Sequence, residues 1–357
     1  MDEEGYFVVD GLRVADVAIG LDWMSRLRMD DRGRTILTNE PEARVIIEAF
    51  DQPLVAIDVE VETASNAEPR LRARFPYGFC AELRGDSLRV DEWDRFYART
   101  EHGVPVVFNR AAQSRFFQAA TEYDDDSISF GQYVFQTRPL FDELEDATDA
   151  AWWDERYESG DTRWDGAGPH PLLDSLISPL KLTRCRVLIL GCGAGHDAAW
   201  WERQGHIVTG VDYSQEAVDR ARANYGERDS LKWVRADAFK LPQEWTSRFD
   251  IVFENTMFCA IPPARREELV RAWWRLLTPR GRVIGLALIM DKLSGPPYGS
   301  SEWEIRRRLL TAPQHGASSA RRARFHPLLW NREKKSIEKR LGHELFFVVE
   351  RADSLTE

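Results

Sequence analysis

The sequence predicts a two-part chain: a smaller α+β domain over residues 1–145, then a doubly wound, mostly parallel α/β domain over residues 146–357. Three observations support this prediction. Apolar runs alternate with helical stretches only in the second part, an acidic stretch (142–149) separates the parts, and a glycine-rich turn follows the first apolar run of the second part. Repeated strand–helix units require a parallel sheet with helices on both faces.

The first part contains short strand-like runs separated by turn-forming residues. We predict strands at Val45–Ala49, Leu54–Thr63, Leu71–Phe75 and Val104–Phe108, and a helix around Arg110–Glu122. Asp58, Glu60 and Glu62 alternate with apolar residues, which is typical of the solvent face of a half-buried strand. A metal site built from them is the less favoured interpretation. The run EAFDQPLVAIDVEVE, with the later strand and helix, resembles an uncharacterised bacterial domain family, which implies no activity.

The second part alternates strand and helix. We predict strands at Val187–Leu190, Ile207–Val211, Leu231–Arg235, Ile251–Glu254, Arg282–Ile289 and Glu344–Glu350, the last of them antiparallel. The helices between them are predicted at His196–Gln204, Gln215–Tyr225 and Pro263–Leu277. Trp200 and Trp201 fall on the first of these helices, where aromatic residues usually pack into the core.

The turn after the first of these strands carries the strongest ligand signal. Gly191, Gly193 and Gly195 allow a sharp turn that brings backbone close to a ligand. Asp212 ends the next strand, about 20 residues on, where a carboxylate can accept hydrogen bonds from a ribose diol. Both NAD and S-adenosylmethionine (AdoMet) contain that ribose. Because His196 and Asp197 follow a Gly-x-Gly-x-Gly turn, the pattern leans away from the dinucleotide fingerprint.

Further polar and aromatic residues follow or precede the strands. Asp237 and Ala238 come after the third strand of this domain, and Glu254 and Asn255 end the fourth. A Gly-Pro-Pro-Tyr loop ending at Tyr298 follows the fifth. The aromatic segment AWWDERYESGDTRWDG lies ahead of the sheet. Since the carboxyl ends of parallel strands meet at one edge, these segments are predicted to share a crevice.

In order along the chain, WWDERYESGDTRWD, LILGCGAGHD, GVDYS, ADAF, FENTMFCAIPPARR and MDKLSGPPYG resemble the thiopurine S-methyltransferase family with its thiol and halide methyltransferase relatives, over residues 151–357. The resemblance implies a class I methyltransferase fold with a seven-stranded sheet, and AdoMet as the cofactor. It implies that the cofactor is contacted by Trp153, Tyr157, Trp164, Gly191, Gly193, Asp212, Asp237, Ala238 and Asn255.

The candidate substrate-lining residues are Trp164, Phe258, Arg266 and Tyr298, and the resemblance implies an arginine near the substrate at the position of Arg266. No acid–base pair is evident, and none is required for methyl transfer to a soft nucleophile such as a thiol, selenol or halide. That reaction is our main hypothesis. A small-molecule O- or N-methyltransferase and a non-catalytic AdoMet-binding regulator remain alternatives. Cys259 is expected to be a small buried hydrophobe, and Asp197 to have a structural role at its helix N-terminus.

Composition narrows the possible partners. A net charge of -11 argues against a nucleic-acid or anionic-membrane partner and leaves a small molecule as the expected one. No apolar run reaches the length of a membrane span, and the acidic beginning is unlike a signal peptide. The 4 cysteines show no zinc-ligand spacing, so no metal is expected and the reducing cytoplasm is the predicted location. The basic stretch Arg306–Arg340 is interpreted as a solvated helical surface.

Overall fold

The computed structural model describes residues 1–39, 43–64, 67–124, 126–141, 149–311 and 324–352. By contacts the chain divides into two compact units. Unit 1 comprises Met1–Glu143, Met290–Ser294 and Ser301–Trp303, and unit 2 comprises Leu144–Ile289, Gly295–Ser300 and Glu304–Glu357. The predicted boundary at residue 145, within the acidic stretch, lies outside the described residues. In the described part of the chain, no helix has the length and apolarity needed to cross a bilayer.

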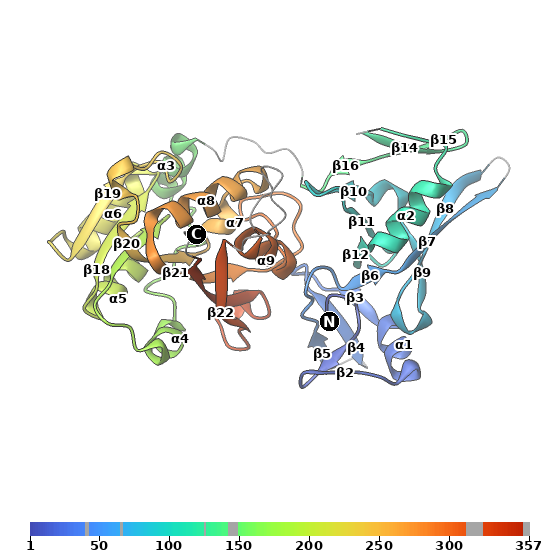
Figure 1. Ribbon diagram of the computed structural model, residues 1–357, viewed down its shortest axis with the longest axis horizontal. Helices are drawn as coiled ribbons and strands as arrows, with labels where there is room; N and C mark the ends of the chain where they lie inside the picture. The colour runs from blue at the N-terminus through green and yellow to red at the C-terminus, as the bar shows by residue number, and fades with distance from the viewer. Residues whose placement is uncertain (40–42, 65–66, 125, 142–148, 312–323, 353–357) are drawn as a thin grey trace, which may run out of the picture. The chain divides into compact units, whose positions relative to one another are not determined.

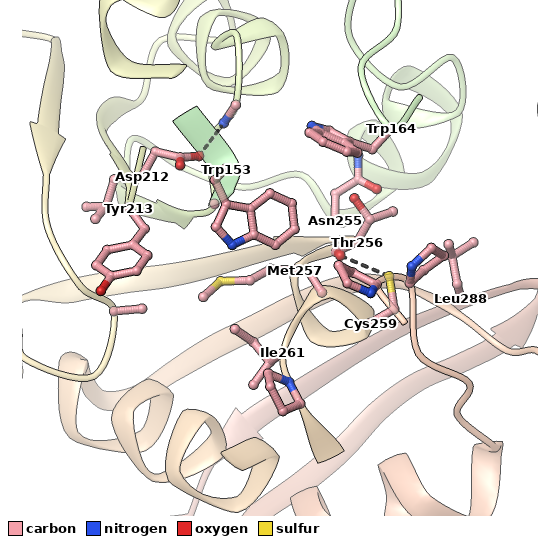
Figure 2. A pocket seen from close by; sticks show the side chains of 18 of the residues that line it. Trp153, Trp164, Asp212, Tyr213, Asn255, Thr256, Met257, Cys259, Ile261 and Leu288 are labelled. Atoms are coloured by element: carbon pink, nitrogen blue, oxygen red, sulfur yellow. Dashed lines mark hydrogen bonds between the residues drawn. The ribbon is translucent and has the colours of Figure 1, made fainter. Parts of the chain in front are cut away.

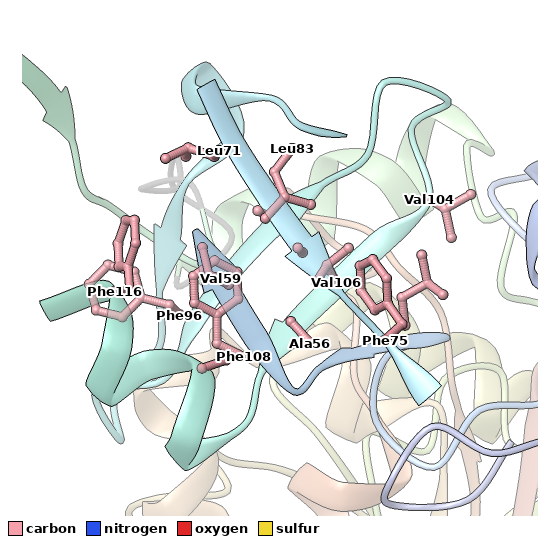
Figure 3. Packing of buried hydrophobic residues seen from close by; sticks show 14 of the residues in the cluster. Ala56, Val59, Leu71, Phe75, Leu83, Phe96, Val104, Val106, Phe108 and Phe116 are labelled. Carbon is pink, nitrogen blue, oxygen red and sulfur yellow. The ribbon is translucent and has the colours of Figure 1, made fainter. Parts of the chain in front are cut away.

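Unit 1 is built from several small sheets around one aromatic core. In strand order these sheets are β1-β2, β3-β4-β5, β7-β8-β9, β13-β14-β15 and the larger β16-β10-β11-β12-β6. Its strands are β1 (Val8–Val9), β2 (Leu12–Arg13), β3 (Leu27–Met29), β4 (Thr35–Asn39), β5 (Ala43–Ile46), β6 (Leu54–Ala56), β7 (Asp58–Ala64), β8 (Ala67–Arg74), β9 (Cys80–Leu83), β10 (Arg89–Val90), β11 (Phe96–Arg99), β12 (Pro105–Phe108), β13 (Glu122–Tyr123), β14 (Ser127–Phe130), β15 (Tyr133–Gln136) and β16 (Arg138–Pro139), and its helices are α1 (Val17–Ser25) and α2 (Arg110–Ala119). Phe116 of α2 packs edge to face against Phe96 of β11 and Phe108 of β12 (Figure 3).

Two details of unit 1 correct the sequence predictions. The run Leu54–Thr63 is not one strand, because β6 and β7 belong to different sheets. Asp58 is not on a solvent face: its side chain is buried, and Arg74 and Arg115 donate to its Oδ2 at 2.9 and 2.8 Å. Among the described residues no group of three or more His, Cys, Asp or Glu is placed to hold a metal ion.

Unit 2 is organised around a seven-stranded sheet of order β19-β18-β17-β20-β21-β23-β22. Its strands are β17 (Arg186–Leu190), β18 (Ile207–Asp212), β19 (Leu231–Arg235), β20 (Phe249–Asn255), β21 (Leu277–Leu288), β22 (Phe325–Arg332) and β23 (Glu344–Arg351), and its helices are α3 (Ala150–Ser159), α4 (Leu173–Ile177), α5 (His196–Arg203), α6 (Gln215–Tyr225), α7 (Met257–Ala260) and α8 (Arg266–Leu276) (Figure 1). Helix α9 (Glu302–Leu310) begins in unit 1 and continues into unit 2. Strands β17 to β21 pair in parallel, and β23 is antiparallel to both β21 and β22. This is the seven-stranded, mostly parallel arrangement that the family resemblance implied.

The alternation of side chains along β17 explains why both faces of the sheet are covered. Leu188 and Leu190 belong to the core cluster that includes α8, whereas Val187 and Ile189 belong to the opposite cluster, which includes Trp201 of α5. Trp200 and Trp201 are both buried, as predicted. The basic stretch 306–340 is not one helical surface. Its described residues include the end of α9 and the strand β22, whose pairing with β23 completes the sheet.

Candidate functional site

A cavity of about 300 Å³ opens where β17, β18, β19 and β20 end. It therefore lies at the edge where the strands of a doubly wound sheet bind their ligands. Figure 2 shows Asp212 and Tyr213 on one side of the cavity and Cys259 and Leu288 on the other, with Trp153 between them. All nine predicted cofactor residues line it: Trp153, Tyr157, Trp164, Gly191, Gly193, Asp212, Asp237, Ala238 and Asn255.

The glycine turn joins β17 to α5, and its glycines have different tasks. Gly193 has φ 54°, and a Cβ placed there would lie 3.1 Å from the Tyr157 hydroxyl. Gly195 has φ 86°, and a Cβ there would lie 2.7 Å from the Trp233 ring. Both positions disfavour any other residue. Gly193 lines the cavity, while Gly195 allows the turn to pack against the rest of the sheet.

Asp212 ends β18 and is fixed by two backbone donors. The N–H groups of Gly193 and Ser214 donate to its carboxylate oxygens at 2.9 and 3.0 Å. Only 9% of the residue is exposed, and burial raises the pKa of its carboxyl, an effect that the backbone donors oppose. A carboxylate has about four lone-pair sites, so Asp212 retains acceptor capacity toward the cavity that it lines.

Three aromatic rings from α3 and the segment after it cover the cavity. The rings of Trp153 and Trp164 meet edge to face at 5.4 Å, and those of Tyr157 and Trp164 at 5.8 Å. The Trp164 indole N–H donates to the Tyr157 hydroxyl oxygen at 3.1 Å. Burial raises the pKa of Tyr157, so this hydroxyl stays neutral. The rings thus form a fixed, largely apolar cover that can present π-faces to a cation.

Contacts with the start of α6 hold α3 in place. Asp149 caps α3 by accepting from the Ala151 N–H at 3.2 Å. Asp154 accepts from the Ser214 hydroxyl at 2.5 Å and from the Glu216 N–H at 3.3 Å. The aromatic cover is therefore tied to the residues that follow Asp212.

The remaining predicted cofactor residues lie at the ends of β19 and β20. The Asp237 carboxylate accepts from the Phe239 N–H at 2.9 Å, and Ala238 is buried beside it. The Asn255 amide donates to Asp197 at 2.7 Å. Asp197 also accepts from the His170 N–H at 2.8 Å, so its carboxylate bonds to two other segments of unit 2.

Three of the predicted substrate residues, Phe258, Arg266 and Tyr298, are not among the residues that line the cavity. Arg266 is fully buried and pairs with Glu304 at 2.8 Å. Phe258 is also buried, and the Arg266 guanidinium lies 4.6 Å from its ring. Tyr298 is buried too, and its N–H donates to the Cys259 carbonyl at 2.7 Å. All three side chains are therefore used in packing and hydrogen bonds inside the protein.

Other lining residues were missed by the sequence analysis. Pro296 and Pro297 precede Tyr298 and form part of the cavity wall. Their loop was predicted to share the crevice, but only Tyr298 was named as a candidate. Tyr213 directly follows Asp212, so proximity to a predicted residue could have found it. Arg340 also lines the cavity, and nothing local distinguishes it within its basic stretch.

Two buried titratable groups lie near the end of β20. Burial raises the pKa of Glu254 to about 8, although the Phe258 N–H donates to its carboxylate at 2.9 Å. Burial likewise raises the pKa of the Cys259 thiol to about 12, so this buried thiol stays protonated at neutral pH. Among the described lining residues there is no histidine, and the carboxylates are Asp212 and Asp237. The cavity suits binding and positioning more than acid–base chemistry.

Comparisons with known proteins agree with this geometry. The thiopurine S-methyltransferase family model matches residues 148–344, more than half of the 357 residues. Thiocyanate methyltransferase 1 of Brassica oleracea is 32% identical over 184 residues, covering 50% of this chain and 80% of that protein. A probable thiol methyltransferase 2 of Arabidopsis thaliana is 32% identical over 178 residues, covering 49% and 78%. A thiopurine S-methyltransferase of Vibrio cholerae is 28% identical over 176 residues, covering 44% and 79%. The chain therefore belongs to the thiopurine S-methyltransferase family and is an AdoMet-dependent methyltransferase.

Proposed function

We propose that this enzyme methylates a small soft nucleophile, a thiol, selenol, halide or thiocyanate-like anion. The observation that carries this proposal is the composition of the cavity: its described lining residues are largely aromatic and apolar, with the carboxylates of Asp212 and Asp237 and three arginines, and none of them is a histidine. The relatives named as thiocyanate and thiol methyltransferases support the same acceptor class.

The residues of the cavity fit AdoMet. Asp212 has spare acceptor capacity for a ribose diol, and Gly193 leaves space where a side chain would otherwise project. Asp237 and Ala238 also line the cavity, and we assign them to the adenine amine and ring. The faces of Trp153 and Trp164 can stabilise a sulfonium by about 1–2 kcal/mol when it is desolvated. When bound, AdoMet supplies an electrophilic methyl group on that positively charged sulfur.

The protein's own contribution is to position and to exclude water. Trp164 and Tyr157 hold each other through their hydrogen bond, so the cover has one arrangement. Met257, Pro296 and Pro297 contribute apolar surface to the cavity. A desolvated anion held in contact with the methyl group reacts without a general base. The cavity therefore needs no such base for this reaction. An O- or N-acceptor would need a proton acceptor at this position.

The test is turnover with defined acceptors. Purified protein is incubated with AdoMet and a panel of iodide, thiocyanate, small thiols, catechols and amines, and release of S-adenosylhomocysteine is measured. We expect turnover with the anions and thiols, and none above background with catechols or amines. Turnover confined to catechols or amines would overturn the proposed acceptor class. Tight cofactor binding with no turnover on any acceptor would support a regulatory role instead.

We also keep the cytoplasm as the proposed location, because Cys80, Cys185, Cys192 and Cys259 are free thiols in the structure.

A further inference from the structure

The charges that line the cavity are unevenly distributed. Asp212 is on one side, and three arginines contribute to the lining elsewhere: Arg163, Arg265 and Arg340. The Arg163 side chain is 88% exposed and pairs with Asp161, and that of Arg265 is 36% exposed and pairs with Glu268. The Arg340 side chain is only 13% exposed. Of these three cations, Arg340 is the one held in a desolvated position, where a charge acts most strongly.

Hydrogen bonds from a single guanidinium nitrogen, Nη1, hold the side chain of Arg340 in position. Its Nη1 donates to Glu344 Oε1 at 3.3 Å and to Asn255 Oδ1 at 3.4 Å. A guanidinium has five N–H donors. Among the described residues, the side-chain hydrogen bonds of Arg340 all come from Nη1, so Nε and Nη2 keep donors for a ligand in the cavity.

The Glu344 carboxylate is not paired with Arg340 exclusively, because it also accepts hydrogen bonds from other residues. His170 Nε2 lies 2.9 Å from the same Oε1 of Glu344, and the Ser336 hydroxyl donates to Oε2. Burial acts to raise the pKa of Glu344, but its hydrogen bonds and the charges of His170 and Arg340 outweigh burial and lower it. Glu344 is therefore an ionised, fully buried anchor that sets the position of Arg340.

Two observations place Arg340 on the side of the cavity away from Asp212. It donates to Asn255, and its charge acts on the Cys259 thiol, although burial dominates the pKa of that thiol. In Figure 2, Asn255 and Cys259 lie on the other side of Trp153 from Asp212, and Cys259 is next to Leu288. If Asp212 binds the ribose, this is the side on which the methyl acceptor enters.

We propose that Arg340 binds the negative charge of the methyl acceptor through its free N–H edge, and so selects anionic acceptors. The inference rests on the proposed function. In the transfer, the acceptor's electron pair forms the new bond to carbon while the carbon–sulfonium bond breaks and leaves its pair on sulfur. One negative and one positive charge disappear together and no proton moves. The methylated product is neutral, so Arg340 binds the acceptor but not the product.

The experiment compares Arg340→Gln, Arg340→Lys and the control Arg280→Gln, whose arginine is 77% exposed on β21. Steady-state kinetics with iodide, an anion at every pH, are combined with calorimetric binding of S-adenosylhomocysteine. We expect Arg340→Gln to raise the KM for iodide about 10- to 100-fold, as for loss of a hydrogen bond to a charged group, and to change cofactor-product affinity less than about twofold. Lysine should restore part of the loss, and the control should match the wild type.

Two outcomes would overturn the proposal: an unchanged KM for iodide, or a loss of S-adenosylhomocysteine affinity that accounts for the kinetic defect, which would assign Arg340 to the cofactor's carboxylate. Thermal melts identify any variant that fails to fold, in which case the lysine variant carries the test. If the wild type turns over no acceptor, the proposed function fails first. Thiocyanate binding to the wild-type complex with S-adenosylhomocysteine, measured against Arg340→Gln, then still decides whether Arg340 is an anion site.

Discussion

Arg95 in unit 1 and Arg340 in unit 2 are both mostly buried arginines, yet they are used differently. All three guanidinium nitrogens of Arg95 donate within unit 1: Nε to Asp91 at 2.8 Å, Nη1 to Asp51 at 2.5 Å and Nη2 to the Tyr97 hydroxyl. Its guanidinium also lies 3.1 Å from the centre of the Trp303 ring. Within the part of the chain that the structure describes, the side chain of Arg340 donates only through Nη1, and it lines a cavity.

The difference shows how to separate structural from functional charge. A buried cation whose donors are all used inside the protein stabilises its surroundings, whereas one with donors left over on a cavity wall can bind a ligand. Arg266 of unit 2 belongs with Arg95, because its Nε, Nη1 and Nη2 all donate to protein oxygens. The comparison thus divides residues by hydrogen-bond use, not by unit.

The largest expected effect is a loss of stability on replacing Arg266, an arginine whose guanidinium nitrogens all donate to protein oxygens. Arg266→Met leaves Glu304 buried with less of its compensating charge, and we expect the free energy of unfolding to fall by about 3–5 kcal/mol. Urea unfolding measures the loss, with the exposed Arg271→Met as control. If stability stayed the same while the KM for the acceptor rose, Arg266 would be a binding residue and the comparison would fail.

The next effect concerns a carboxylate with spare acceptor capacity. Asp212→Asn removes the charge while keeping one acceptor oxygen for the backbone donors. We expect S-adenosylhomocysteine affinity to fall by about 1.5–3 kcal/mol, roughly 10- to 100-fold, by calorimetry. Asp250→Asn, at the other end of the sheet and paired with Arg186, is the matched control and should bind normally. Equal affinities for all three proteins would contradict the ribose assignment.

A smaller effect tests the aromatic cover. Trp153→Leu keeps an apolar side chain but removes the π-face, worth about 1–2 kcal/mol to a desolvated cation. Affinity for AdoMet, which carries the sulfonium, should therefore fall more than affinity for the neutral S-adenosylhomocysteine. The ratio of the two dissociation constants is the measurement, and a parallel loss for both ligands would show that the ring provides packing alone. Trp274→Leu, which lies outside the cavity lining, serves as control.

The smallest effect concerns Glu254, a buried carboxyl whose pKa is raised to about 8 by burial. Because the folded state holds this proton more tightly than the unfolded state, its contribution to stability is full below about pH 4.5 and is lost as the pH rises toward 8. The loss amounts to at most about 1.4 kcal/mol per pH unit. Urea unfolding at pH 6 and pH 7 should show a shallower decline for Glu254→Gln than for the wild type. Identical declines would mean that Glu254 ionises normally when folded.

The sequence by itself determined most of the unit 2 sheet. Every strand of that sheet except β22 was predicted, because continuous apolar runs and the glycine turn are local features of the chain. It also placed Gly193, Asp212 and Asn255 on one edge, since residues that end parallel strands must converge. Strand β22 (FHPLLWNR) was missed because Pro327 and the flanking charges hide an edge strand whose pairing with β23 is non-local.

Only the tertiary structure decided which side chains turn toward the cavity. Phe258, Arg266 and Tyr298 sit in the right segments but point into the core, where Arg266 meets Glu304, 38 positions further along the chain. Arg340 reaches the cavity because Glu344 and Asn255 fix it, and Asn255 is 85 positions away. Local periodicity encodes strands and their ends, whereas the direction of a side chain beyond a strand end depends on packing partners that sequence spacing does not reveal.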